Sequence, residues 1–320
     1  MKTVAASEEA RRQARKDLRS KIKLEKDFIR KLTRLNNQIV RKMMIEFANK
    51  GIVLNAREFE DELAALLENQ YSRAQKVFDD QIRDVLPKDL ESNGIEDAAI
   101  ALALGLFFAD RKISQSQIIT RTNQKDIIKS IVQADEILQD AADVGEIVTN
   151  REVAKNAGTL LRRKLKGRTR TIAATEVQVA AETSKAVETA VLTRNQLSLP
   201  RFEFRFSVPQ LPLGLPPPEL EKEWVTSGDE KVRRKSTGKF SHVKADGQKV
   251  KISESFIVSN EFLRIPGDTS QGASLGNVIN CRCASVRDKR GVLNARKAIF
   301  EAETQLELET EVALPEFGFS

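Results

Sequence analysis

The sequence is poor in the residues that cross-link small proteins or build common catalytic sites. Its 320 residues include only two cysteines, one histidine and one tryptophan. Two cysteines are too few for a disulfide framework, and a ring closed across one intervening residue would be strained, so we expect reduced thiols and assembly inside a cell. The single histidine excludes the His-Glu-x-x-His pattern of zinc peptidases, and no phosphate-binding loop of a nucleotide-driven motor is present. We therefore expect no catalysis.

Long apolar runs are also missing. The most apolar stretch, Ile95–Ala109, contains Glu96 and Asp97 and is shorter than the roughly 20 residues that a membrane span needs. The polar, basic amino terminus does not fit a secretory signal. The sequence predicts no membrane partner.

Charge is abundant but unevenly spread. Residues 1–50 hold fifteen Lys or Arg against six Asp or Glu, whereas residues 301–320 hold six Glu and no basic residue. A basic helical arm can follow a phosphate backbone without reading bases, which favours non-specific contact with double-stranded DNA. The alternative is a solvated helix face.

A second basic cluster lies between residues 161 and 170. Six of these ten residues are cationic, and we take them as candidate DNA-binding residues: Arg162, Arg163, Lys164, Lys166, Arg168 and Arg170. An acidic protein surface is the alternative partner, and the helix dipole would account for some of the cations near a helix end. Gly167 is placed to break and cap the preceding helix.

Hydrophobic periodicity predicts that the first 195 residues are mostly helical. Apolar residues recur at steps of three and four from Phe28 to Phe47, and this stripe either packs on the chain's own next helix or forms a coiled-coil seam used in assembly. Further helices are predicted from Asn55 to Leu86, from Ile95 to Ala109 as a buried central helix, and over 116–142, 150–166 and 170–190.

The second part of the chain has strand and turn signals. Residues 201–207 alternate charge and aromatic side chains, and five of the next eleven residues are proline, which predicts an extended segment. Short strands are expected at 224–225, 249–252, 256–258, 262–265 and 278–279, with Asp246-Gly247 as a hairpin turn. The fold class is α+β, with a mostly helical bundle followed by a small mixed domain. The predicted divisions are 1–195, 196–218, 219–290 and an acidic helix and tail at 291–320.

Both cysteines lie in one short segment, Cys281-Arg282-Cys283. Side chains two positions apart on a strand leave the same face, so both sulfurs can reach one point. With His242 and either Asp229 or water they would complete a tetrahedral site, and the soft ligands favour zinc. The alternative is two buried fillers and a histidine that is hydrogen-bonded in a loop.

These pieces resemble, in order, the phage head-morphogenesis domain of the bacteriophage Mu F-like minor head proteins. A helix that contains Thr175-Glu176 precedes the domain in the way that a helix precedes it in the family. The positions that carry the resemblance are Trp224, Thr226, Asp229, Arg233, His242, Asp246, Gly247, Phe256, Pro266, Gly267, Asp268, Asn280, Cys281, Arg282 and Cys283. Two departures are Ala174, where the family usually has arginine, and a long interval between Arg233 and His242.

The resemblance implies a minor head protein of a tailed phage. Such a protein would be made in the host cytoplasm, lie inside the capsid near the portal, bind portal and other capsid proteins, and influence DNA packaging, retention or ejection. Two alternatives are a metal-dependent nuclease or hydrolase, with Asp229 or Glu230 as its base, and a plain DNA-binding protein that needs only the basic arms.

Overall fold

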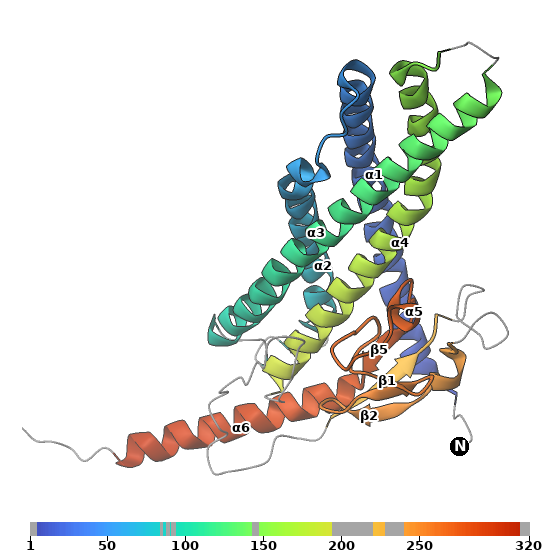
Figure 1. The fold of residues 1–320 in the computed structure, drawn as a ribbon. Helices are drawn as coiled ribbons and strands as arrows, with labels where there is room; N and C mark the ends of the chain where they lie inside the picture. The colour runs from blue at the N-terminus through green and yellow to red at the C-terminus, as the bar shows by residue number, and fades with distance from the viewer. Residues whose placement is uncertain are drawn as a thin grey trace, which may run out of the picture. The chain divides into compact units, whose positions relative to one another are not determined.

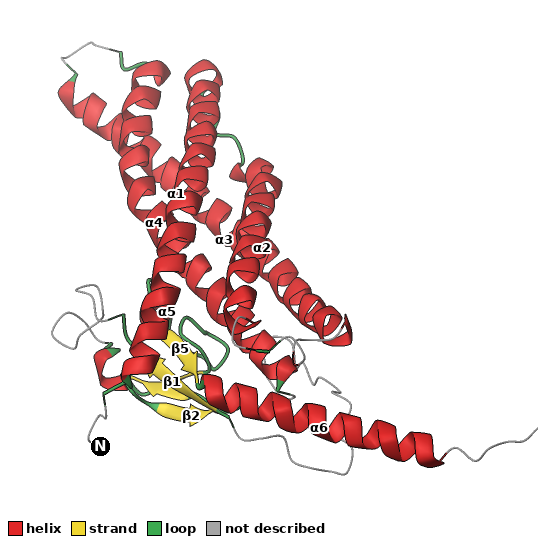
Figure 2. Cartoon of the chain, turned by 180° about the vertical axis from the view of Figure 1, so that it is seen from behind, coloured by secondary structure: helices red, strands yellow, loops and turns green. Residues whose placement is uncertain are grey.

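The computed structural model describes residues 5–83, 86–87, 90, 94–142, 147–193, 220–227 and 240–313. Over these residues the chain is mostly helical, with a few short antiparallel strands in its carboxyl-terminal part (Figures 1 and 2). The predicted α+β fold class is confirmed. The extended segment 196–218 and the motif residues Asp229 and Arg233 lie outside the described residues.

Four long helices make up most of the amino-terminal part. They are α1 (Glu8–Lys50), α2 (Glu60–Arg83), α3 (Gly94–Ala141) and α4 (Asn150–Leu192). A 3₁₀ turn, η1 (Ala56–Phe59), leads into α2, and the side chain of Asn55 caps it by accepting a hydrogen bond from the Arg57 amide. The predicted helix start near Asn55 is therefore confirmed.

Two predicted helix boundaries are wrong. Gly167 does not end a helix, because α4 continues from Asn150 to Leu192. A single glycine in a helix costs only about 1 kcal/mol relative to alanine, and the nearly continuous burial of residues 176–193 outweighs that cost. Similarly, the segments predicted as separate helices at 95–109 and 116–142 form one helix, α3.

The amino-terminal half of α3 is not buried on all sides, as its apolar composition had suggested. Ile100, Ala103 and Leu104 are buried, but Leu102 is 59% exposed and Leu106 is 42% exposed. A helix buries one face against its neighbours, and these two leucines lie outside that face.

The described residues divide into two compact units, and each long helix contributes to both. Unit 1 contains residues 1–21, 74–105 and 178–320, and unit 2 contains residues 22–73 and 106–177. In unit 2 the predicted apolar stripe of α1 is buried, with Phe28, Leu32 and Met43 fully enclosed. The stripe therefore packs within the chain rather than serving as an open coiled-coil seam.

Helices α1 and α4 are antiparallel neighbours in unit 2. The Asn36 side-chain amide donates to the Thr169 hydroxyl at 3.0 Å, and a Cβ added at Gly158 would lie 3.5 Å from Met44 Cγ. In both contacts the residue numbers of the two partners sum to a little over 200. This sum defines the register of the two antiparallel helices, because the numbers fall along α4 as they rise along α1.

Unit 1 holds all the described strands. A three-stranded antiparallel sheet has the order β2-β1-β5, and a hairpin pairs β3 with β4. The strands are β1 (Glu221–Val225), β2 (Lys249–Lys251), β3 (Phe256–Val258), β4 (Glu261–Leu263) and β5 (Ala284–Arg287). A strand predicted at 278–279 is wrong, because Val278 ends the short helix α5 (Leu275–Val278). The chain continues into α6 (Lys289–Ala313), where a terminal helix was expected.

Three apolar clusters stabilise unit 1. The first surrounds Trp224 and Phe256 and includes both cysteines. In the second, alanines at the start of α1 pack on Val225 and Val286 of the sheet. The third joins Val292 of α6 to side chains that include Leu86, Leu192, Leu220 and Ile252. Within the described helices, none is both long and apolar enough to cross a membrane.

Candidate metal centre

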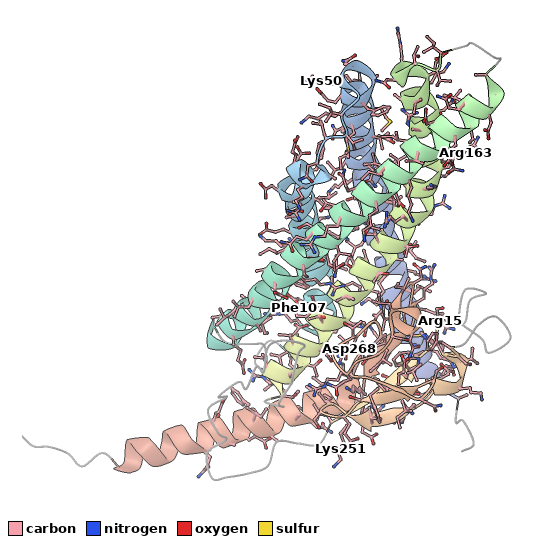
Figure 3. All side chains as sticks on the ribbon, in the orientation of Figure 1. Arg15, Lys50, Phe107, Arg163, Lys251 and Asp268 are labelled. Carbon is pink, nitrogen blue, oxygen red and sulfur yellow. The ribbon has the colours of Figure 1, made fainter. Side chains whose placement is uncertain are left out.

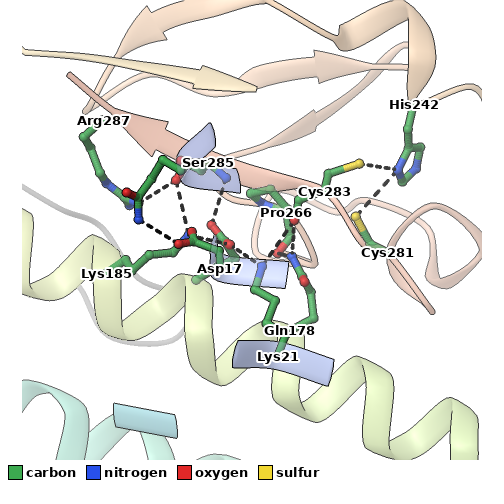
Figure 4. Close-up of polar contacts among 12 residues, drawn as sticks. Asp17, Lys21, Gln178, Lys185, His242, Pro266, Cys281, Cys283, Ser285 and Arg287 are labelled. Carbon is green, nitrogen blue, oxygen red and sulfur yellow. Dashed lines mark hydrogen bonds and ion pairs between the residues drawn. The ribbon is translucent and has the colours of Figure 1, made fainter. Parts of the chain in front are cut away.

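The segment that leads into β5 and the loop before β2 bring one histidine and two cysteines together in unit 1. The ligand atoms of His242, Cys281 and Cys283 all lie within 4.8 Å of one another, and all three residues are buried. The Nδ1 atom of His242 lies 3.6 Å from Cys281 Sγ and 3.4 Å from Cys283 Sγ (Figure 4). The sequence prediction that these three side chains converge is thus met by the geometry.

These distances fit tetrahedral coordination. Zinc holds sulfur at about 2.3 Å and imidazole nitrogen at about 2.0 Å, so two such ligands of one ion lie about 3.5 Å apart. The observed nitrogen–sulfur separations of 3.6 and 3.4 Å agree with that value. Two sulfurs and one nitrogen also form the soft donor set that selects zinc over magnesium or calcium. The predicted fourth ligand, Asp229, lies outside the described residues.

Asn277 sets the orientation of the histidine ring. Its amide nitrogen donates to the Val258 carbonyl at 3.0 Å and to the Glu261 carboxylate at 2.9 Å, so its oxygen must face the other way. That oxygen lies 2.8 Å from His242 Nε2. It therefore accepts a hydrogen bond from Nε2–H. The Nδ1 lone pair is left directed at the two sulfurs, as a metal-ligating histidine requires.

Asn277 was missed by sequence reasoning. It lies four residues before Cys281 in α5, within a segment predicted as loop and strand. Nothing in its spacing separates it from Asn280, which the family resemblance does include. Asn280 has a φ of 55°, in the left-handed region that asparagine tolerates better than most residues, and it turns the chain into Cys281.

The two thiols have unequal acidity. The pKa of Cys281 lies well below the usual range, chiefly because Cys283 hydrogen-bonds to its sulfur. Burial raises the pKa of Cys283 well above that range. Cys281 is therefore the more acidic of the two thiols, and binding of a divalent cation by both sulfurs as thiolates would be accompanied by proton release.

Trp224 covers one side of the site. Its indole ring packs edge-on against the His242 ring at 5.8 Å and against the Phe256 ring at 5.2 Å, and Trp224 is fully buried. Such aromatic contacts fix ring positions and exclude water from the thiols. The motif tryptophan therefore contributes to the wall of the site.

The remaining described motif positions close turns of the same module. Asp246 accepts hydrogen bonds from the Thr226 amide and hydroxyl, and Gly247 has a φ of 79°. Asp268 accepts from the Arg264 and Ser270 amides. Between these turns, Pro266-Gly267 approaches α4 so closely that a Cβ on Gly267 would lie 3.2 Å from Gln178 Cγ.

Side chains of α4 and α1 complete the exposed edge of the sheet. Among the described strands, β5 pairs only with β1, and its other edge is hydrogen-bonded by helix side chains (Figure 4). Gln178 donates to the Cys283 carbonyl at 2.8 Å, and the Ser285 amide donates to Glu182 at 3.1 Å. These bonds replace a neighbouring strand and fix the backbone that carries Cys283.

A buried charge network holds the same helix side chains. Lys21 contacts Glu182 at 2.7 Å, and Lys185 contacts both Glu182 and Asp17, at 2.8 and 2.7 Å. Burial raises the pKa of Glu182, but the ammonium groups of Lys185 and Lys21 outweigh it and lower the pKa from 4.5 to about 2. Glu182 is therefore a permanent buried anion, and sequence reasoning did not identify it.

One sequence pattern that is known from enzymes was not among the predictions. Residues 272–276 match the Gly-x-Ser-x-Gly pattern of serine hydrolases. Ser274 here precedes the single turn of α5 in an ordinary extended conformation, and its hydroxyl donates to Glu261 at 3.1 Å. The ring nitrogens of His242 face Asn277 and the cysteine sulfurs. The segment thus lacks the strained strand-to-helix turn that exposes a nucleophile.

The predicted DNA-binding residues do not form one group. Arg162, Arg163, Lys164, Lys166 and Arg170 are exposed on α4, whereas Arg168 is partly buried and forms an ion pair with Asp126. Lys164 is directed towards Ser130 of α3. Figure 3 labels Arg163 on the ribbon of α4. Arg168 is therefore engaged in packing between helices of unit 2.

Comparison with known proteins gives no match to any family model, curated protein or solved structure.

Proposed function

We propose that this chain is a minor head protein of a tailed bacteriophage that acts in head assembly near the portal and contacts packaged double-stranded DNA without sequence preference. Its partners would be the portal and other capsid proteins, in the host cytoplasm during assembly and then in the capsid interior. A zinc ion held by His242, Cys281 and Cys283 would pin the carboxyl-terminal module, and the role would be non-catalytic.

One observation carries the proposal. The described positions of the family resemblance, which span residues 224 to 283, gather in one small module, and several of them have a structural task there. Trp224 packs against one side of the cysteine–histidine cluster, and Asp246 and Asp268 stabilise turns by accepting hydrogen bonds from backbone amides. A chance likeness in sequence would not require its scattered positions to meet around one site. This supports the family assignment and favours structure over catalysis as the purpose of the motif.

The experiment tests whether the protein is incorporated into phage heads. The chain is tagged in the phage or prophage that encodes it, heads are purified by density gradient, and the tag is detected by immunoblot beside the portal protein. We expect co-purification with heads, and retention on the portal in 1 M salt if buried apolar area carries the contact, because salt screens charge but not apolar burial. A chain that is absent from every head fraction contradicts the proposal.

The strongest alternative is a metal-dependent hydrolase. It would need an open metal position and a carboxylate base, for which the sequence offers Asp229. In that case Asp229→Asn would abolish hydrolysis of DNA or another phosphodiester in the zinc-loaded protein while the fold persists. The assembly proposal expects no such hydrolysis in either protein.

A further inference from the structure

Unit 2 carries a largely basic face on two adjacent helices, and only part of it coincides with the cluster found in the sequence. Glu152, whose carboxylate accepts hydrogen bonds from Thr149, is an exposed acidic residue on the same side of α4. On α4, exposed cations recur at intervals of four and seven residues, which places them on one side of the helix. This row, the α4 row, consists of Arg151, Lys155, Arg162, Lys166 and Arg170, with Arg163 beside it. At 1.5 Å per residue it is about 29 Å long.

Helix α1 carries a matching row. Five exposed cations of its unit 2 segment share one side of the helix, and this α1 row consists of Lys23, Lys26, Arg30, Arg34 and Arg41, whereas Lys42 is directed to Glu58. Arg30 is paired with Asp27 on its own helix. Among the described residues, no hydrogen bond or ion pair occupies Lys23, Lys26, Arg34, Arg41, Arg162, Arg163, Lys166 or Arg170.

The two rows flank the same seam between α1 and α4. The Asn36–Thr169 hydrogen bond and the Met44–Gly158 approach lie along that seam. Their register puts Arg41 level with Arg162 and Arg34 level with Arg170. On each helix the row lies next to the residues that face the seam. The cations of the two rows therefore lie on the two sides of one surface strip, the α1–α4 strip. By contrast, Lys164 and Arg168 face α3.

The residue types in this strip favour a phosphate backbone over other anionic partners. Its uncharged exposed members, Thr33, Asn37, Gln38, Asn156 and Thr159, can hydrogen-bond to phosphate oxygens. No aromatic side chain lies among these strip residues to stack on unpaired bases. Ile45, four residues after Arg41, is exposed beside the strip, but one apolar side chain is not the apolar face that binding to a lipid surface needs. A length of about 29 Å matches eight to nine base pairs of one DNA strand, at about 3.4 Å each.

We infer that the α1–α4 strip is a binding face for the phosphate backbone of double-stranded DNA. The inference rests on the proposed function, since it locates the DNA contact of the head protein. It also changes the residue set. Lys164 and Arg168 leave the face, and the residues that join it are Lys23, Lys26, Arg30, Arg34, Arg41, Arg151 and Lys155.

The test measures binding of the full-length chain to a 30-base-pair duplex by fluorescence anisotropy over a series of salt concentrations. Each phosphate contact contributes about 0.9 to the slope of log affinity against log salt. We expect the pairs R162Q/K166Q and R34Q/R41Q each to lower the slope by about 1.8, and the four changes together by about 3.6. A duplex of unrelated sequence should give the same values.

The matched control is K125Q/K129Q, which removes the same charge from exposed positions of α3 in unit 2. It should leave the slope unchanged, and circular dichroism should show equal helicity in all variants. An equal loss in the control would mean that net charge and not this face binds DNA, and would overturn the inference. So would tighter binding to phosphatidylserine vesicles or to polyglutamate than to DNA. DNA binding by the four-fold variant that equals that of the unchanged protein, in a chain that enters heads normally, would refute this face alone, whereas absence of the unchanged chain from heads would refute the proposed function.

Discussion

The side-chain oxygen of Asn277 lies 2.8 Å from Nε2 of His242, and this contact decides which nitrogen of the only histidine faces the two cysteines. The amide cannot turn over without losing its bonds to Val258 and Glu261. The protein thus holds the imidazole in the tautomer that a metal ion needs, through a residue that does not touch the metal position.

Replacement of Asn277 by alanine should weaken zinc binding by about 10- to 100-fold, because loss of an outer-shell partner frees the ring orientation. Competition with a chromophoric chelator measures the affinity. The matched control is Asn156→Ala, an exposed asparagine on α4 in unit 2. Equal affinity of the Asn277 variant and the unchanged protein would contradict the role given to this contact.

Replacement of either cysteine by serine should abolish stoichiometric zinc and lower the free energy of unfolding. The carboxyl-terminal module has short strands and a small apolar cluster, so a bound metal should contribute much of its stability. Elemental analysis of the purified chain gives the metal content, and urea unfolding gives the stability. Less than about a tenth of an equivalent of metal, together with normal folding of Cys281→Ser and Cys283→Ser, would refute the zinc site.

Acid should destabilise unit 1 through Glu182. Its pKa is about 2 in the folded protein and 4.5 ordinarily, so its stabilising effect is fully present above pH 4.5 and is lost as the pH falls towards 2. Glu182→Gln should therefore unfold more easily at pH 7, by about 3 to 5 kcal/mol, since it leaves Lys21 and Lys185 without their shared anion. Thermal unfolding of both proteins between pH 2 and pH 7 should show the difference shrinking at the acid end.

Base should destabilise the protein through Glu188. Burial and the nearby Asp79 raise its pKa from 4.5 to about 9, although Arg83 opposes the shift. The folded state therefore retains a proton that the unfolded state has lost above pH 4.5, and stability falls as the pH rises from 4.5 towards 9. Glu188→Gln should mimic the protonated group and raise the unfolding free energy at pH 8, by about 1 to 3 kcal/mol.

At pH 4 the Glu188→Gln variant and the unchanged protein should unfold alike, which serves as the internal control. A stabilisation of equal size at pH 4 and pH 8 would mean that the effect is one of packing and not of proton binding.

Several parts of the fold follow from local sequence alone. The α1 stripe from Phe28 to Met43 predicts a helix with one buried face, since helical periodicity depends only on residue spacing. The Asn55 cap and the convergence of Cys281 and Cys283 are equally local. Asp246-Gly247 does form a turn, but the hairpin predicted there is wrong, because the turn follows the 3₁₀ helix η5 (Val243–Ala245) and does not directly join two paired strands. Local spacing failed where burial decided the outcome. Gly167 lies within a continuous helix, because burial over the following residues outweighs the preference of glycine for a helix end.

For the candidate sites, the sequence determined which side chains could bind a metal or a phosphate backbone, because those abilities belong to the residue types. Only the tertiary structure decided how they are used. The Asn277 contact, the buried Glu182 anion and the pairing of the α1 and α4 rows each join residues that are 35 or more positions apart. Such contacts depend on which surfaces the long helices and the sheet bring together, and no spacing rule along the chain contains that information.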